Sequence, residues 1–405
     1  MRVLVTAGGE LELDPEKRPR PKTEKEQKAL RRALVHFQLA NYLAADTEIE
    51  EAKKKLIHRY ELATRRVKEQ NQQDLYRIFL NAYATSLDPH STYFSPDDLE
   101  DFRIQMELSL TGIGAVLSSD DGYTIIEEIV PGGAADRHGK LRPKDKIIAV
   151  AQDKGEPVDV IDMALRDVVK LIRGEKDTKV TLSVLRQGAE NEHLRFTIVR
   201  DQIDLKEQAA QLRWLDVKRG EKTLKLAFLD LPSFYRGDGP GARDSAADVA
   251  RLVAEAKQKK ADGLLLDLSR NGGGVLQSAV SISGLFIEEG AVVGVGDHSP
   301  KSLPQILEDD DKRVQWDGPL VVLTSKASAS ASEILAGALQ DYRRAVVVGD
   351  QHTYGKGTVQ QLNQLPPGLG LLKVTTAMFF LPGGSSTQRV GVPSDIIVPS
   401  IFSAL

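Results

Sequence analysis

The sequence predicts a multidomain α/β protein, and three stretches of different character predict it. Residues 23–86 carry helical periodicity with short connections. From about residue 109 to residue 200, short apolar runs are broken by glycine, with one helix between them. From residue 224 onward strands and helices alternate. Such alternation is typical of a layered α/β domain, in which ligands bind beyond the carboxyl ends of the strands.

Composition sets the broad class. The 405 residues are enough for two or three domains, and contents of 41% hydrophobic and 28% charged residues are those of an ordinary globular protein. A net charge of −4 gives no electrostatic reason to expect nucleic acid or an anionic membrane as partner. The absence of cysteine excludes disulfides and thiolate metal sites. No apolar run approaches the roughly 18–20 residues that a membrane helix needs.

Residues 1–22 are predicted to be loose, ending in a basic, proline-containing run. They lack the charged-then-apolar layout of a signal peptide. The simplest interpretation is a cytosolic protein, although an exported chain without its leader would look the same.

The segment 23–106 is predicted to be an N-terminal helical segment. Thr23 with Glu26, and Thr47 with Glu50, have the spacing of a helix-starting capping box. The helices are expected to end near Tyr42 and Asn71, and a third to cover about Asp74–Ser86. The turn Asp88-Pro-His90 follows. No acidic pattern surrounds His90, so a turn residue is favoured over a catalytic one.

The segment 107–200 begins with the glycine loop Gly112-Ile113-Gly114-Ala115-Val116. The expected order is then strand 123–129, strand 146–151, helix 159–172 and strand 179–186. A glycine loop ahead of a strand lets backbone N–H groups converge on an anion, here the carboxylate at the end of a peptide. With this element order the segment resembles a PDZ domain, which binds C-terminal tails as an added strand. The candidate groove residues, each with core packing as the alternative, are Ile113, Val116, Leu117, Met163 and Val168.

The segment 201–405 contains the stretch that carries chemistry. An apolar strand, 320–323, leads into Ser328-Ala-Ser-Ala-Ser332 and a helix over about 331–340. A second apolar run, 345–348, leads through a glycine-rich turn to Lys356. Because a helix N-terminus offers unpaired N–H groups, a serine there is well placed to be a nucleophile beside an oxyanion site. A lysine from the next loop could serve as its base.

A Ser–His–Asp hydrolase is the less favoured alternative. No serine lies in a Gly-x-Ser-x-Gly turn, and of seven histidines only His352 is near the serine cluster. A lysine base, in contrast, must be neutral. Its pKa must fall from about 10.4 towards 7–8, at a cost on the order of 4 kcal/mol. Lys356, between two glycines and with no acid nearer in sequence than Asp350, fits that requirement.

Several motifs in order resemble the C-terminal processing, or tail-specific, proteases, and above all their large Gram-negative periplasmic branch. The motifs are Asp88-Pro-His90, Leu110-Thr-Gly-Ile-Gly-Ala-Val-Leu117, Asp267-Leu-Ser-Arg-Asn-Gly-Gly-Gly274, Ser328-Ala-Ser-Ala-Ser-Glu-Ile334, Gln340-Asp-Tyr342, Gly355-Lys-Gly-Thr-Val-Gln360 and Gly384-Ser-Ser-Thr-Gln-Arg389. The resemblance covers residues 25–400. It implies an α/β, crotonase-like Ser–Lys protease core with an inserted PDZ domain, working without metal or nucleotide.

The resemblance also implies roles for individual residues. Ser330 would be the nucleophile, Lys356 its general base and Gln360 the residue that orients the amine. The N–H groups of Ala331 and Gly273 would form the oxyanion hole. Ser328 and Ser332 are expected to be packing residues, Asp341 to support the helix and Glu333 to cap its first turn.

The resemblance implies substrates as well: proteins with free apolar C-termini, bound by the PDZ domain in the cell envelope, with a lipoprotein adaptor in some relatives. The turn Gly349–Lys356 is one residue longer than is usual in that family. The extra residue either displaces Lys356 or is accommodated at Gln351–His352. The first outcome would leave a tail-binding module instead of a protease. An envelope scaffold that uses the N-terminal helices is the other alternative.

Overall fold

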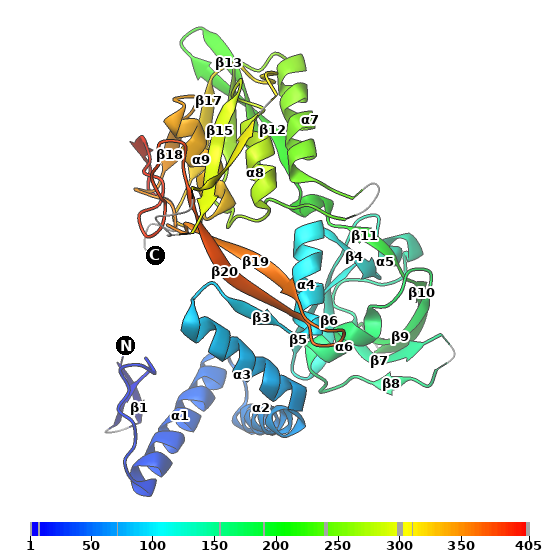
Figure 1. The fold of residues 1–405 in the computed structure, drawn as a ribbon. Helices are drawn as coiled ribbons and strands as arrows, with labels where there is room; N and C mark the ends of the chain where they lie inside the picture. The colour runs from blue at the N-terminus through cyan, green and yellow to red at the C-terminus, as the bar shows by residue number, and fades with distance from the viewer. Residues whose placement is uncertain are drawn as a thin grey trace. The chain divides into compact units, whose positions relative to one another are not determined.

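A computed structural model describes residues 2–6, 9–70, 72–153, 155–188, 191–238, 242–297, 303–309 and 311–401. Its internal contacts divide the chain into two compact units (Figure 1). Unit 1 joins residues 1–71 to residues 112–201, and unit 2 joins residues 72–111 to residues 202–405. The domain limits predicted from sequence, at residues 23, 107 and 201, stay a prediction.

Unit 1 begins with a hairpin and two helices. The elements are β1 (Arg2–Thr6), β2 (Gly9–Glu12), α1 (Glu24–Ala44) and α2 (Ile49–Glu69). The sequence predicts a loose segment over 1–22, but β1 and β2 pair antiparallel. The alternating β-branched residues of β1 favour a strand. At α1 the predicted cap is confirmed, because the Thr23 side chain accepts a hydrogen bond from the Glu26 N–H.

The second predicted capping box is wrong. The N-cap of α2 is Glu48, one residue after Thr47, and it makes no side-chain cap bond. The backbone N–H of Thr47 instead donates to the carbonyl of Tyr42 at the end of α1. Thr47 therefore belongs to the turn that closes the first helix.

The rest of unit 1 is a small antiparallel β domain with two short helices. Its sheet has the order β10-β9-β7-β6-β5, with β8 pairing β7, so β5 is an edge strand. A buried cluster that includes Ile126, Ile147, Val168 and Leu182 forms its core. The elements are β5 (Ala115–Asp120), β6 (Tyr123–Ile129), α5 (Ala134–His138), β7 (Lys146–Gln152), β8 (Val158–Asp159), α6 (Leu165–Ile172), β9 (Lys179–Arg186) and β10 (Glu192–Val199).

The helix predicted over 159–172 is correct only in its second half. Asp159 ends strand β8, and Asp162 has φ of 64°. A residue in this left-handed region interrupts a right-handed helix. The helix therefore begins at Leu165.

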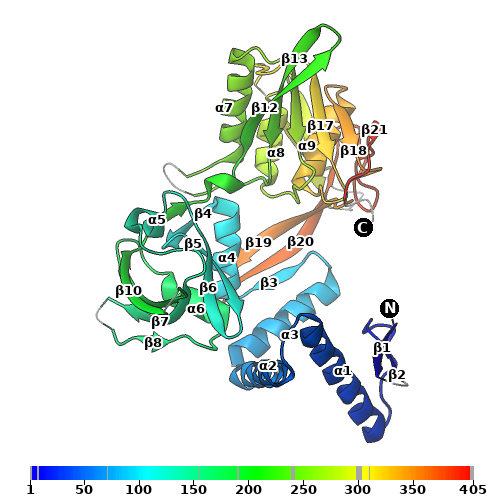
Figure 2. The same ribbon diagram turned by 180° about the vertical axis from the view of Figure 1, so that it is seen from behind.

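Unit 2 contains a six-stranded sheet with the order β12-β13-β14-β17-β18-β21, parallel from β13 to β21. Figure 2 shows β21 beside β18 near the C-terminus. A second sheet has the order β16-β15-β20-β19, with β3 pairing β20. Before the sheets come α3 (Gln72–Leu87), β3 (Thr92–Phe94), α4 (Pro96–Glu107) and β4 (Ser109–Gly112), which pairs β11 (Asp201–Asp204).

The remaining elements of unit 2 include the predicted strands and helices in their predicted order. They are η1 (Lys206–Gln208), β12 (Gln211–Arg219), β13 (Lys222–Asp230), α7 (Ser245–Gln258), β14 (Gly263–Asp267), α8 (Leu276–Ser283), β15 (Gly290–Gly296), β16 (Gln305–Asp309), β17 (Leu320–Thr324), α9 (Ala331–Asp341), β18 (Val346–Gly349), β19 (Thr358–Gln364), β20 (Leu371–Phe380) and β21 (Ile396–Ile397). The elements of unit 2 that were not predicted are α4, η1, β3, β4, β11, β12, β16, β19 and β21. The α/β fold class is confirmed.

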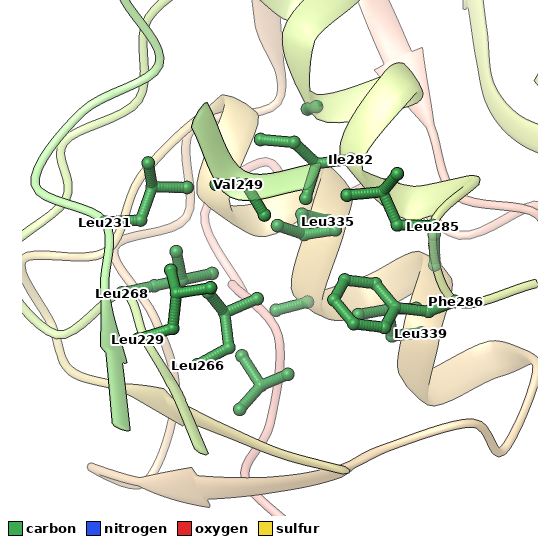
Figure 3. Close-up of a cluster of buried hydrophobic side chains, with 14 of the residues drawn as sticks. Leu229, Leu231, Val249, Leu266, Leu268, Ile282, Leu285, Phe286, Leu335 and Leu339 are labelled. Atoms are coloured by element: carbon green, nitrogen blue, oxygen red, sulfur yellow. The ribbon is translucent and has the colours of Figure 1, made fainter. Parts of the chain in front are cut away.

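Helices α7 and α9 contact the parallel strands, and α8 packs against α7 and α9. Their apolar side chains share one core with the strands, as Figure 3 shows for Leu229, Leu266, Ile282 and Leu335. Every residue of α9 from Ala331 to Leu339 is buried. Burying this much apolar surface is the main stabilising term for such a core. It fixes the N-terminus of α9 at the carboxyl end of β17.

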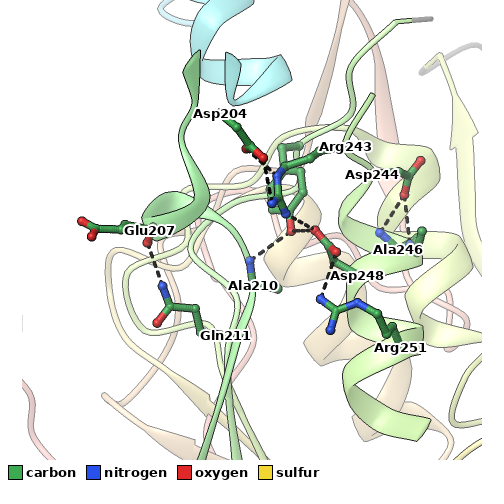
Figure 4. Close-up of polar contacts among 11 residues, drawn as sticks. Asp204, Glu207, Ala210, Gln211, Arg243, Asp244, Ala246, Asp248 and Arg251 are labelled. Carbon is green, nitrogen blue, oxygen red and sulfur yellow. Dashed lines mark hydrogen bonds and ion pairs between the residues drawn. The ribbon is translucent and has the colours of Figure 1, made fainter. Parts of the chain in front are cut away.

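A polar cluster closes the start of α7 (Figure 4). Arg243 donates to Asp204 at 2.7 Å and to Asp248 at 3.0 Å, and the Tyr235 hydroxyl also donates to Asp248, at 2.8 Å. Burial, reinforced by the Asp248 carboxylate, raises the pKa of Tyr235. The cluster therefore connects the chain after β11 to the N-terminal turn of α7.

Candidate active site

Ser330 is the N-cap residue of the buried helix α9 and has φ of 59° and ψ of −114°. A non-glycine residue in such a conformation costs on the order of 1–3 kcal/mol, and the surrounding structure must hold it there. Strain of this kind clusters at functional sites. The structure therefore places the predicted nucleophile on a strained turn between β17 and α9.

Glu333 holds that turn and the turn of the predicted base together. Its fully buried carboxylate accepts hydrogen bonds from the N–H groups of Ser330 at 2.7 Å, Gly355 at 2.7 Å and Lys356 at 2.9 Å. The Thr353 hydroxyl donates to it at 2.7 Å. Burial raises the pKa of Glu333, although these four donors act against that rise. The capping role predicted from sequence is thus only part of what Glu333 does.

Lys356 follows the turn after β18. Burial and, to a smaller extent, the positive charge of Lys373 lower the pKa of its amine to about 8, against the pull of the Glu333 and Asp88 carboxylates. A lysine with such a pKa is substantially neutral near pH 8. It can therefore accept a proton from a hydroxyl group.

Ser330, Lys356 and Gln360 line one cavity of about 420 Å³. Two glycines of the 272–274 turn and a second lysine, Lys373, line it as well. Helix α4, which the sequence did not predict, supplies two apolar side chains. The other lining residues are Phe102, Met106, Val275, Leu276, Ile334, Thr358, Val359, Leu362 and Phe379. The mostly apolar lining accounts for the desolvation of both lysines.

Gln360 lies on β19, where the register slips between Val359 and Gln360. Its side-chain amide donates to the hydroxyls of Thr358 at 2.9 Å and Thr375 at 3.0 Å. Neither partner was singled out from the sequence. The role of Gln360 as the residue that orients Lys356 stays a prediction.

The two predicted oxyanion donors differ. Ala331 is the first residue of α9, so its N–H has no acceptor within the helix. The N–H of Gly273 donates to the side chain of Asn271 at 2.8 Å. A Cβ at Gly273 would lie 2.9 Å from the Cβ of Ser330, so this glycine lets the two turns approach closely. In this conformation its N–H is already engaged.

The two flanking serines have structural contacts. The hydroxyl of Ser328 donates to the carbonyl of Leu268, and that of Ser332 to the carbonyl of Asn271, both at 2.8 Å. Both residues are fully buried. Of the three serines, Ser330 alone lines the cavity.

His352 does not line the cavity. The backbone of His352 forms an isolated antiparallel β-bridge with Pro393, and the His352 Nδ1 lies 2.7 Å from the carbonyl oxygen of Thr353. The neighbouring Thr353 N–H donates to the carbonyl of Val392. This bridge holds the part of the long turn where the extra residue was expected to be accommodated.

His90 lies in the turn that the sequence predicts, where its N–H donates to Asp88. Burial lowers the pKa of its ring, and the charge of Lys356 lowers it further. Asp341, which is predicted to support the helix, accepts a hydrogen bond from the N–H of Gly383 at 2.8 Å.

The residues of the glycine loop 112–116 differ in their hydrogen bonds and in their exposure. Gly114 has φ of 75°, and its carbonyl accepts from Val130, while the carbonyl of Ile113 accepts from Ala135. Gly112 is buried, and Ala115 starts the edge strand β5. Val116 is 48% exposed on that strand, which contacts α6.

The predicted groove residues divide accordingly. Ile113 and Val168 are 3% and 0% exposed, so for these two the core alternative holds. Leu117 and Met163 are partly buried against the same core. The carbonyl of Ile113 accepts from Ala135 at the start of α5, and Ile113 belongs to the same buried cluster as Ala135.

Two absences concern the part of the chain that the structure describes. There, no three His, Cys, Asp or Glu side chains come together in a way that could hold a metal ion. None of the helices in the same part combines the length and apolarity needed to cross a bilayer.

Three family models match the chain in order. Residues 4–97 match the tail specific protease N-terminal domain, residues 101–185 the PDZ domain and residues 225–398 peptidase family S41. The tail-specific protease of Haemophilus influenzae is 41% identical over 98% of this chain and 56% of its own length. The carboxyl-terminal-processing protease of Synechocystis sp. is 31% identical over 81% of this chain and 72% of its own length.

Solved structures were also found. The PDZ domain of a carboxy-terminal protease from Vibrio cholerae, in complex with peptide, is 49% identical over 24% of this chain and 98% of its own, with a TM-score of 0.23. The photosystem II D1 C-terminal processing protease is 25% identical over 84% of this chain and 86% of its own, with a TM-score of 0.46.

The class of protein is defined by three parts in order: a match to the tail-specific protease N-terminal domain, a match to the PDZ domain, and an α/β core with Ser330 at the N-terminus of a helix. The chain belongs to peptidase family S41. Within that family it is of the tail-specific, or C-terminal processing, type. It spans 56% of the length of the Haemophilus relative.

Proposed function

We propose that this chain is a serine endopeptidase that binds apolar C-terminal tails of proteins and cleaves them with a Ser330–Lys356 pair. The observation that carries the proposal is that Ser330, Lys356 and Gln360 line one cavity in which burial lowers the pKa of Lys356 to about 8. A serine needs such a base, because its hydroxyl is a weak nucleophile at neutral pH.

The proposed reaction has two halves. The Ser330 Oγ attacks the peptide carbonyl carbon while Lys356 takes the hydroxyl proton, and the N–H of Ala331 stabilises the oxyanion. The C–N bond then breaks, and Lys356 returns the proton to the departing amine. Water, deprotonated by Lys356, hydrolyses the remaining ester and frees Ser330. No step needs a metal or a nucleotide.

Tail binding is assigned to the PDZ domain. Strand β5 is the edge of its sheet and contacts α6, and Val116 is exposed on that edge. An extended peptide can add to such an edge as a further strand, with apolar side chains between strand and helix. The loop 112–116 stands at the start of this strand, where a terminal carboxylate would lie.

The test uses a reporter protein that ends in an apolar tail. Cleavage by the wild-type chain should fall by on the order of 10³-fold or more in Ser330→Ala. Binding of the labelled tail peptide should be unchanged. If Ser330→Ala cleaves as fast as wild type, the nucleophile is a different residue.

A second candidate function is a tail-binding module that does not cleave. One observation favours it: the Gly273 N–H donates to Asn271, so one predicted oxyanion donor is engaged. In that case the wild-type chain would bind the tail peptide and leave the reporter intact.

The family resemblance also suggests an envelope location and a lipoprotein adaptor, and both are proposals. Fractionation of cells that produce the full-length protein tests the location. An exclusively cytoplasmic protein would contradict it. Co-purification from envelope fractions, with Ser330→Ala used to retain bound proteins, tests the adaptor.

A further inference from the structure

The turn that carries Asp88 lies next to β20, the strand that pairs with the Gln360 strand β19. Strand β3, which begins at Thr92, pairs with β20, and Lys373 is the partner of Thr92. Strand β20 also pairs with β19, where Gln360 stands directly opposite Thr375. Because cross-strand partners have neighbouring side chains, the Asp88 turn, Thr375 and Gln360 are brought together by sheet register. All of these residues belong to unit 2.

A chain of hydrogen bonds connects them. The Thr375 hydroxyl lies 2.6 Å from Oδ2 of Asp88, and the side-chain amide of Gln360 lies 3.0 Å from the same hydroxyl. Ser91 donates to the same Asp88 oxygen at 2.8 Å and accepts from the Thr375 N–H at 3.2 Å. The sequence marked Asp88 only as part of a turn motif. Its carboxylate reaches the predicted site through one threonine.

The direction of these bonds follows from the chemistry of the carboxylate. Burial raises the pKa of Asp88, but hydrogen bonds from Thr375, Ser91 and His90 outweigh burial and hold the pKa below its usual value. An ionised carboxylate can only accept hydrogen bonds. The Thr375 hydroxyl must therefore donate to Asp88, and its oxygen is left to accept.

That direction fixes the Gln360 amide. A threonine oxygen that accepts requires the NH₂ end of Gln360, which is the end that donates to Thr375 and to Thr358. Both amide hydrogens are then used. The carbonyl end remains as the acceptor that Gln360 can offer in the cavity it shares with Lys356.

We propose that Asp88 is a positioning residue that, through the Thr375 hydroxyl, sets which end of the Gln360 amide faces Lys356. The proposal rests on the proposed Ser–Lys reaction. A neutral lysine amine that donates one of its own N–H hydrogens to the Gln360 carbonyl oxygen keeps its lone pair available to accept the serine proton. If the amide were reversed, its NH₂ group would donate to that lone pair and block the base.

The substitution Asp88→Asn tests this direction, because it keeps the shape of the side chain and adds a donor. The asparagine NH₂ can donate to Thr375, whose hydroxyl then turns to donate to the Gln360 carbonyl and so reverses the amide. With the apolar-tail reporter, kcat should fall by roughly tenfold to a hundredfold, since general-base assistance is weakened. KM should stay within about twofold, because tail binding is separate from this network.

A matched pair at Thr375 provides the control. Thr375→Val has nearly the same shape and lacks the hydroxyl, so it should lower kcat as Asp88→Asn does. Thr375→Ser retains the hydroxyl and should keep most of the wild-type kcat. If Asp88→Asn does not fold, as judged by its thermal unfolding, this pair carries the test alone. Equal kcat values for Thr375→Val and Thr375→Ser would overturn the proposal.

The decisive measurement is a double-mutant cycle with Gln360→Ala. If Asp88 acts through Gln360, then Asp88→Asn, or Thr375→Val in its place, should change kcat by less than about twofold in the Gln360→Ala background. An equal loss in both backgrounds, or no loss in the wild-type background, overturns the role of Asp88.

Assays of the wild-type and Ser330→Ala chains in the same experiment distinguish a failure of this inference from a failure of the function on which it rests. Cleavage that depends on Ser330 supports the proposed function, whatever Asp88→Asn does. A wild-type chain that leaves the reporter intact overturns both.

Discussion

The turn that carries Ser330 and the loop 112–116 look alike in the sequence, since each is a run of small residues beside a strand. In the structure the polar groups around Ser330 have partners inside the protein, whereas the loop 112–116 leads into a strand with an open edge. Ser330 is held by Glu333, and Ser328 and Ser332 donate to carbonyls of the 268–271 turn. The loop 112–116 instead leads into β5, an edge strand on which Val116 is exposed.

The comparison shows how the two proposed tasks use the backbone. Bond-making needs a few atoms fixed to within fractions of an ångström, so nearby polar groups have partners inside the protein. Binding an extended tail needs N–H and C=O groups that are still open to a new strand. Four predictions test this contrast, from the largest effect to the smallest.

Lys356→Met should lower the rate of cleavage of the apolar-tail reporter by on the order of 10²–10⁴-fold, because it removes the proposed general base. Affinity for the tail peptide should not change, since the substitution lies in unit 2 and the edge strand in unit 1. Stopped-flow acylation rates and peptide binding measure the two effects. A parallel loss of tail affinity would show that the two regions do not act separately.

Glu333→Gln should lower kcat by roughly tenfold to a hundredfold. The glutamine can accept with only one oxygen, so some of the four donors now held by the carboxylate lose their partner. Unsatisfied buried donors cost about 1–3 kcal/mol each, so the free energy of unfolding should also fall. Denaturant unfolding together with kcat measures both. Full activity at reduced stability would mean that Glu333 supports the fold and not the site.

Val116→Glu should weaken tail binding by about tenfold, since a carboxylate on the edge strand repels the terminal carboxylate of the peptide and removes apolar contact. The control is Val158→Glu, because Val158 is 43% exposed on another strand of the same domain. Fluorescence anisotropy with a labelled tail peptide gives both affinities. Equal weakening by the two variants would remove β5 as the binding edge.

The pH dependence of kcat should show the smallest effect. With a pKa of about 8 for Lys356, kcat should rise as the pH is raised through that value, because the neutral amine is the base. The charge of Lys373 lowers this pKa, so Lys373→Met should move the midpoint to higher pH. The expected displacement is under about one pH unit. A midpoint that moves to lower pH would contradict the assigned coupling.

The same shift has a consequence for stability. The pKa of Lys356 is lower in the folded chain than the ordinary lysine value of 10.5, so the unfolded chain binds more protons between about pH 8 and pH 10.5. Stability should therefore rise with pH across this window. At neutral pH, where the buried amine is charged, Lys356→Met should stabilise the fold.

The sequence by itself determined the α/β class and the candidates Ser330 and Lys356. It also predicted three strands of unit 1 (β6, β7 and β9) and six of unit 2 (β13, β14, β15, β17, β18 and β20). Apolar period, glycine turns and a serine at a helix entrance are local signals, and local signals can be read from neighbouring residues.

The prediction from sequence also missed α4, although Ser95, Pro96 and Asp98 form a local helix-start signal that could have predicted it. The apolar residues of α4 matter because they line the cavity. The prediction also placed a cap at Thr47, because it could not anticipate that the Thr47 N–H closes the preceding helix.

Only the tertiary structure decided what surrounds those residues. Glu333 reaches the Lys356 turn, Lys373 enters the cavity, and Asp88 contacts Thr375 across 287 positions of sequence. It also made Ile113 a core residue and Val116 an exposed one. These are results of strand register and of burial, which depend on residues far apart in the chain. The local sequence identifies the residues that could react, whereas tertiary packing sets their pKa values and their hydrogen-bond partners.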